Sequence, residues 1–127
     1  MSQENVAIVR QIYERWDRGA TASDLIAPDV EYINPDYAVE PGTRRGRDSF
    51  DEVGSSLADF KLEIERVVDA GPDEVVVCAR YSAYGRGSGV PLGGEHGYVW
   101  TIRDGVAVRF RWFQSHDEAL AAAGVGT

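Results

Sequence analysis

Residues 95–114, EHGYVWTIRDGVAVRFRWFQ, decide the fold, because they predict two antiparallel strands joined by a tight turn. Asp104-Gly105 suits the positive φ angles of a two-residue hairpin turn, and apolar residues alternate on both sides of it. Alternation places the larger side chains on one face of the two strands. That face carries His96, Tyr98, Trp100, Ile102, Val106, Val108, Phe110, Trp112 and Gln114.

The opposite face of these two strands predicts an interface between two copies of the chain. Arg109, Arg111 and Phe113 project there beside Val99 and Thr101. An aromatic side chain among arginines is typical of protein–protein contacts. We therefore expect a homodimer formed through this face.

Three more strands are predicted upstream. Residues 61–68 and 75–84 are separated by a turn at Gly71-Pro72-Asp73, and a glycine-rich hairpin is expected over residues 85–94. Residues 29–34 alternate and stop at Pro35, since proline removes a donor from the ladder. The Pro, Gly and Asp content of residues 35–46 predicts a loop.

Helices are expected mainly in the first half of the chain. Residues 3–18 place apolar side chains at three- and four-residue spacings, and residues 22–26 predict a short turn stopped by Pro28. Asp48 is expected to cap a helix to about residue 58, with Phe50, Val53 and Leu57 on one side. The order predicts an α+β class with the helices on one face of the sheet.

Size and charge narrow the possible partners. The 127 residues fit a single domain over 1–127, and the net charge of -8 argues against nucleic acid and anionic membranes as partners. One cysteine, Cys78, cannot form an internal disulfide, and no segment has the roughly 20 apolar residues of a membrane span. We expect a soluble, cytoplasmic protein.

The shared aromatic face predicts a concave, mostly apolar pocket, because large rings lie there together with polar groups that need partners when buried. His96 is the candidate catalytic residue, since an imidazole titrates near neutrality. A competing interpretation places His96 at the mouth of the hairpin, bonding the loop near Gly93-Gly94. The residues expected to contact a ligand are Trp16, Tyr32, Asn34, Phe50, Tyr81, Tyr98, Trp100, Phe110, Trp112 and Gln114.

No cofactor is expected from the sequence. It has no His-x-His, His-Glu-x-x-His or paired-cysteine spacing for a metal, and no glycine-rich turn between a strand and a helix for a phosphate. Cys78 lies in an apolar run typical of a buried strand, and His116 is interpreted as a helix-capping or solvent-facing residue.

The order of several motifs resembles the nuclear-transport-factor-like superfamily and its SnoaL-like members. They are Trp16-Asp17-Arg18-Gly19, Ile26-Ala27-Pro28-Asp29-Val30-Glu31-Tyr32-Ile33-Asn34-Pro35, Arg45-Gly46-Arg47, Tyr98-Val99-Trp100-Thr101-Ile102-Arg103-Asp104-Gly105, Trp112-Phe113-Gln114 and Glu118-Ala119-Leu120-Ala121-Ala122-Ala123-Gly124. The resemblance implies a cone: a curved, mixed but mostly antiparallel sheet wrapped around N-terminal helices and enclosing a pocket.

The resemblance also bears on the reaction. Ketosteroid-isomerase-like relatives carry an aspartate base where Asn34 stands, and SnoaL-like polyketide cyclases carry an acid where Gln114 stands. Tyr32-Ile33-Asn34 matches the water-holding pair of limonene-epoxide-hydrolase-like members, but the acid relay that accompanies it is missing. Steroid isomerisation is therefore not expected, and proton transfer would fall to His96.

Two functions follow from these observations. The first is a pocket that binds a small, mostly apolar, polycyclic molecule, or transforms it without a cofactor as an isomerase, cyclase or hydrolase would. The second is a non-catalytic interaction domain that dimerises and whose pocket is vestigial.

Overall fold

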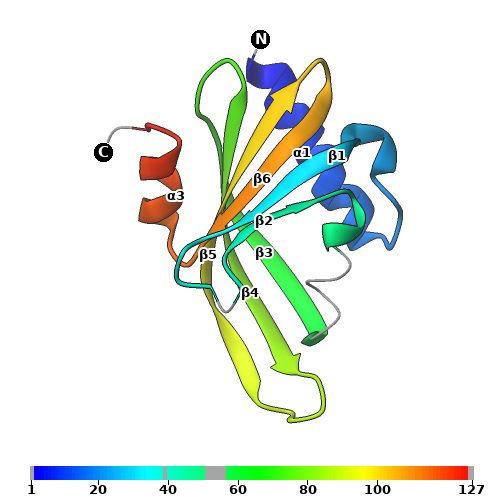
Figure 1. The fold of residues 1–127 in the computed structure, drawn as a ribbon, viewed down its shortest axis with the longest axis vertical. Coiled ribbons are helices and arrows are strands. Elements are labelled where there is room, and N and C mark those ends of the chain that lie inside the picture. The colour runs from blue at the N-terminus through cyan, green and yellow to red at the C-terminus, as the bar shows by residue number, and fades with distance from the viewer. Residues whose placement is uncertain (1, 39, 51–56, 126–127) are drawn as a thin grey trace.

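The computed structural model describes residues 2–38, 40–50 and 57–125 and has the predicted α+β class (Figure 1). Its centre is an open, mixed sheet of six strands in the order β2-β1-β6-β5-β4-β3. The strands are β1 Ile26–Asn34, β2 Gly42–Arg45, β3 Leu57–Asp69, β4 Glu74–Gly85, β5 Pro91–Arg103 and β6 Val106–Phe113.

Pairing of β1 with β6 is parallel, and all other neighbours are antiparallel. Tyr32 of β1 lies opposite Phe110 of β6, which in turn lies opposite Trp100 of β5. The hairpin between β5 and β6 turns at Asp104 and Gly105, with φ angles of 52° and 81°. The predicted Asp-Gly turn is therefore confirmed.

Helix α1, Ser2–Asp17, packs on one face of the sheet, which we call the inner face. Val9 and Ile12 are fully buried there with Val75 and Val77 of β4 and Trp100 of β5. These side chains form the main core, and the amphipathic spacing predicted for residues 3–18 is what directs α1 onto the sheet.

Helix α3, His116–Ala122, covers part of the opposite, outer face, so the expectation that all helices share one face is wrong. Figure 1 shows α1 and α3 on opposite sides of the sheet. Ala119 is buried against Val76, Cys78 and Val99. Gly97 permits this approach, because a Cβ atom there would lie 2.5 Å from the Ala119 Cβ and 2.8 Å from the Ser115 carbonyl oxygen.

Four predicted boundaries need correction. Strand β1 begins at Ile26, directly after the 3₁₀ turn η1, Ser23–Leu25, and runs through Pro28. Proline is accommodated because the register with β6 shifts between Ile26 and Glu31. The loop predicted at residues 35–46 contains β2, which pairs with β1 through its backbone.

The other two boundaries concern a helix and a turn. A helix begins at Asp48 as predicted, but residues 57 and 58 already belong to β3, and Val53 lies outside the described residues. The turn expected over residues 85–94 is shorter, since β5 begins at Pro91. Of the helices in the described ranges, none has the length and apolar character needed to cross a membrane.

Candidate functional site

Five polar or aromatic side chains from four neighbouring strands meet at the inner face. We call them the inner-face cluster, and they are Asn34 of β1, Trp112 of β6, His96 and Tyr98 of β5, and Tyr81 of β4. The alternation predicted for β5 and β6 is what brings these side chains to the same face. All five were predicted from the sequence to line a pocket.

His96 and Tyr98 form a hydrogen-bonded pair, with 2.9 Å between His96 Nδ1 and the Tyr98 hydroxyl. Burial lowers the pKa of His96 to about 4 and raises the pKa of Tyr98 well above its ordinary value. Both groups are therefore neutral at pH 7. The expectation that His96 titrates near neutrality is wrong, because burial disfavours the charged imidazolium.

Aromatic rings enclose His96 on two sides. Tyr81 stacks on the imidazole with ring centroids 4.1 Å apart, and the Trp112 indole lies at 5.5 Å. Tyr81, His96 and Trp112 are only partly buried, so this end of the inner face is accessible. The contact of His96 with Tyr98 is a pairing on the sheet, unlike the loop contact of the hairpin-mouth interpretation.

Asn34 is buried and is held by Trp112, whose indole nitrogen Nε1 donates to Asn34 Oδ1 at 2.6 Å. This bond joins the ends of two parallel strands. Asn34 thus has a specific tertiary partner, beyond the local turn that an asparagine before proline often forms.

Other predicted ligand contacts are used for packing. Trp100, Tyr32 and Phe110 are 0%, 6% and 5% exposed, and their rings pack with Phe50 and Trp16 at centroid distances of 4.7 to 6.1 Å. The Trp100 indole donates to the Tyr13 hydroxyl at 3.0 Å. These side chains fill the inner face beside α1, whereas Tyr81, His96 and Trp112 of the inner-face cluster are only partly buried.

Gln114 does not point inward as expected. Strand β6 ends at Phe113, so the alternation stops one residue early and the Gln114 side chain is exposed. The backbone N–H of Gln114 instead meets the hydroxyl of Tyr37 at 2.7 Å, and that hydroxyl donates to Glu118 at 2.9 Å. Tyr37 also lies edge-on to Trp112, a neighbour that the loop composition around it gave no means of predicting.

The outer face differs from the predicted dimer interface. Phe113 is partly buried with Val99 in the cluster beneath α3, and Thr101 is buried. Arg109 pairs with Glu31 at 3.1 Å and Arg111 with Glu74 at 3.0 Å. This face therefore offers no exposed aromatic at Phe113.

His116 was predicted to cap α3 or face solvent, and both expectations are wrong. The cap is Ser115, whose hydroxyl accepts from the Glu118 backbone N–H at 3.1 Å. The imidazole of His116 is partly buried, and its Nε2 lies 2.9 Å from the Ala79 carbonyl oxygen, to which it must donate. His116 thus attaches α3 to β4.

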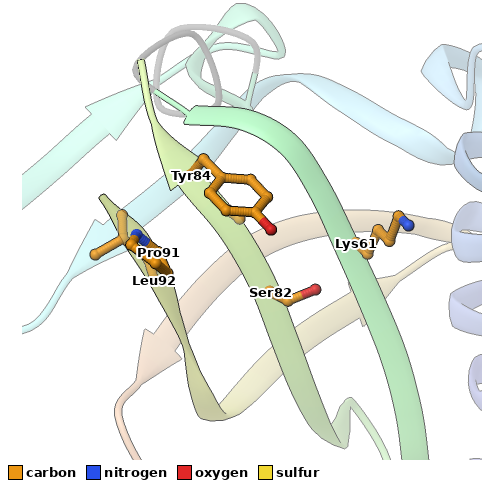
Figure 2. A pocket seen from close by; sticks show the side chains of 6 residues that line it. Lys61, Ser82, Tyr84, Pro91 and Leu92 are labelled. Atoms are coloured by element: carbon orange, nitrogen blue, oxygen red, sulfur yellow. The ribbon is translucent and has the colours of Figure 1, made fainter. Parts of the chain in front are cut away.

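Surface hollows among the described residues also lie outside the inner-face cluster, and two of them are large. The hairpin hollow, about 490 Å³, is shown in Figure 2 and is lined by Lys61, Ser82, Ala83, Tyr84, Pro91 and Leu92. Ser82 and Tyr84 alternate with Tyr81 along β4, so they face away from His96. A second hollow of about 290 Å³ includes Trp16, Phe50 and Arg47, and the Arg47 Nε donates to the Ile26 carbonyl at 2.8 Å.

The chemistry available at the inner-face cluster is that of neutral hydrogen-bonding groups among flat apolar surfaces. A phenol and an imidazole in contact offer a ligand both a donor and an acceptor. General-base catalysis is most effective with a pKa near the working pH, so a histidine with a pKa of about 4 is a weak base at pH 7.

Comparisons with known proteins agree with this fold. Residues 9–110 match the family model of the SnoaL-like domain, whereas no curated protein sequence matches the chain. An NTF2-like protein from Burkholderia thailandensis is 26% identical, with 94% of this chain and 95% of that chain covered and a TM-score of 0.74.

Two further solved structures share the fold at lower identity. TerC, co-crystallised with polyporic acid, is 20% identical over 95% of this chain and 98% of its own, with a TM-score of 0.72. A protein from Jannaschia sp. CCS1, assigned provisionally as a SnoaL-like polyketide cyclase, is 19% identical over 98% and 94%, with a TM-score of 0.70.

Proposed function

Because the chain belongs to the SnoaL-like domain family, we propose that it binds a small, uncharged, mostly apolar molecule at the inner-face cluster, or transforms it without a cofactor. The observation that carries this proposal is the neutral His96–Tyr98 pair, whose imidazole lies against the partly buried rings of Tyr81 and Trp112. Apolar walls with a few fixed polar groups are the usual composition of a small-molecule site.

Two fold relatives support a small-molecule function of this kind. TerC was crystallised with polyporic acid, and the Jannaschia protein is assigned provisionally to the polyketide cyclases. We infer that a reaction at this site would be an isomerisation, cyclisation or hydrolysis with His96 as the proton-transfer group. The low pKa of His96 restricts such a reaction to substrates with unusually acidic protons.

Binding can be tested with N-phenyl-1-naphthylamine, a neutral apolar probe whose fluorescence rises in apolar sites. We expect saturable binding and a higher melting temperature, since a ligand at 100 times its Kd adds about 2.7 kcal/mol of stability. Tyr81→Ala removes the ring that stacks on His96 and should weaken binding by about three- to tenfold.

The matched control is Tyr84→Ala, which makes the same change in the hairpin hollow. It should leave probe affinity unchanged. Loss of binding in Tyr84→Ala with full binding in Tyr81→Ala would move the site to the hairpin hollow. An absence of saturable binding to the unmodified protein would contradict the proposal.

A second candidate function is a dimerising interaction domain, favoured by exposed apolar side chains at the β4–β5 hairpin. Tyr84, Val90 and Leu92 are 48%, 53% and 41% exposed, although large apolar side chains are usually covered. We propose a homodimer that uses this end of the sheet in place of the outer-face residues Arg109, Arg111 and Phe113.

A further inference from the structure

The hollow of about 290 Å³ lies where the chain passes from α1 to β1 and contains no residue of the inner-face cluster. We call it the arginine hollow. It is lined by residues 19–23, which connect the two elements, by Trp16 and Ile26 at their ends, and by Arg47 and Phe50. It therefore combines apolar surface with a single cation.

The apolar part of the arginine hollow is flat and fixed from behind. The rings of Trp16 and Phe50 lie with their centroids 5.3 Å apart, and both are partly buried. The Phe50 ring also stacks on the buried Trp100 at 5.7 Å, and Ile26 and Ala22 are 4% and 2% exposed. A flat apolar group laid on these rings would remove their remaining surface from water.

The cation is Arg47, and only part of its guanidinium is used by the protein. Its Nε donates to the Ile26 carbonyl oxygen at 2.8 Å, which anchors the side chain at the hollow. The two Nη groups have no acceptor and no ion-pair partner among the residues that the structure describes. A guanidinium presents planar, paired N–H groups, which match the two oxygens of a carboxylate.

Neighbouring groups leave this charge available. The pKa of Asp24 is lowered chiefly by its hydrogen bond from Arg15, with which it forms an ion pair, and Arg47 has the smallest of the listed effects on it. The hydroxyls of Thr21 and Ser23, 3.0 Å apart, line the same hollow and add polar partners. Because the chain carries a net charge of -8, a singly charged anion is favoured over a phosphate.

We propose that the arginine hollow binds a small aromatic carboxylate, with its ring against Trp16 and Phe50 and its carboxylate on the two Nη groups of Arg47. This site is separate from the inner-face cluster, and its ligand is charged, unlike the uncharged molecule of the proposed function. The two proposals therefore stand or fall independently.

The test compares 2-naphthoate with 2-naphthamide, two probes of the same shape of which only the first is charged. A hydrogen bond between charged groups is stronger than a neutral one, so we expect about a tenfold lower Kd for 2-naphthoate at low ionic strength, measured by calorimetry. Arg47→Gln should abolish this preference. Arg10→Gln removes the same charge from an exposed position of α1 and should retain it.

A second pair of variants keeps Arg47 and its bond to Ile26. Ser23→Asp places a carboxylate at the arginine hollow, where it competes for Arg47, and should also abolish the preference. Ser82→Asp makes the corresponding change in the hairpin hollow and should have no effect. If Arg47→Gln does not fold, this second pair decides the question alone.

The position of the probe can also be measured without a variant. We expect nuclear Overhauser effects between the ring protons of bound 2-naphthoate and the methyl groups of Ile26 and Ala22, which line the arginine hollow.

Three outcomes would overturn the proposal: no binding of 2-naphthoate, equal Kd values for the two probes, or a preference that survives Ser23→Asp. Loss of the preference in Ser82→Asp alone would place the carboxylate beside Lys61 in the hairpin hollow, and would overturn it as well. None of these results affects the inner-face cluster, whose test uses the uncharged N-phenyl-1-naphthylamine.

Discussion

At the scale of single residues, the inner-face cluster depends on pairs in which one side chain fixes the other. Trp112 holds the Asn34 oxygen, and Tyr98 meets His96 Nδ1. Among the described residues, the Asn34 NH₂ group and the second ring nitrogen of His96 have no hydrogen-bond partner. A ligand that satisfies these groups gains hydrogen bonds without reorganising the protein.

His96→Gln should reduce the dependence of stability on pH. The pKa of His96 is about 4 in the folded protein, against an ordinary value of 6.5, so the unfolded chain binds the extra proton between these values. The stability linked to this group is complete above pH 6.5 and is lost as the pH falls toward 4.

The measurement is urea unfolding of both proteins at pH 7.5 and pH 4.5. The unmodified protein should lose more unfolding free energy than His96→Gln when the pH is lowered. A difference between the two proteins that is the same at both pH values would show that His96 is not desolvated as described.

Residue-level prediction from sequence succeeded where alternation in a central strand determines the face. His96, Tyr98 and Trp112 lie on the predicted side because β5 and β6 are regular there. The prediction that Gln114 points inward was wrong because the strand ends at Phe113, and alternation does not locate strand ends. The low pKa of His96 also lay beyond prediction, since it arises from burial by rings of other strands.

At the scale of elements, α3 is attached to the outer face by small and polar contacts. Ser115 caps its first turn, the backbone N–H of His116 donates to Glu95 at 2.6 Å, and Ala119 packs over Gly97. The absence of a side chain at Gly97 is what lets the helix approach β5. Packing thus explains why glycine stands at this position, although a glycine in the interior of a strand usually weakens the strand.

Gly97→Ala should lower the free energy of unfolding by about 1–3 kcal/mol, because the new methyl group would overlap Ala119 and the Ser115 carbonyl. Chemical denaturation measures this directly. Adding Ala119→Gly to the same variant should recover part of the loss, since it removes one of the two close atoms. A Gly97→Ala protein as stable as the unmodified one would contradict the close packing.

Element prediction failed mainly where a strand lacks an apolar pattern. Strand β2 is a short edge strand whose Gly42, Thr43 and Arg45 are exposed, so hydrophobic alternation is absent and only backbone pairing with β1 defines it. The outer-face position of α3 could not be predicted either, because its small residues show no strong apolar stripe. The hairpin at Asp104-Gly105 was predictable because its turn chemistry is local.

At the scale of the whole molecule, apolar surface is distributed unevenly. Rings fill the inner face beside α1, and the exposed apolar side chains of the described residues include Tyr84, Val90 and Leu92 at the β4–β5 end. A net charge of -8 opposes self-association in general, so a specific contact would have to exclude acidic side chains.

We expect a homodimer at micromolar concentration, seen by light scattering as twice the 13.9 kDa mass of the chain. Replacing Val90 and Leu92 with Lys should shift the protein to monomer, because charges would be buried at the contact. The control is Thr43→Lys, which adds a charge on the exposed strand β2 and should leave the dimer intact. A monomer from the unmodified chain would reject the dimer.

Parallel pairing of β1 with β6 has a consequence for how the chain folds during synthesis. Glu31 lies opposite Arg109, 78 residues later, so the β1–β2 hairpin cannot take its place in the sheet until strand β6 has emerged from the ribosome. Contacts of such long range slow the search for the native state. A nascent chain halted at Gly105 would leave Tyr32 and Asn34 without their β6 neighbours Phe110 and Trp112, and their apolar surroundings would stay open until synthesis resumed.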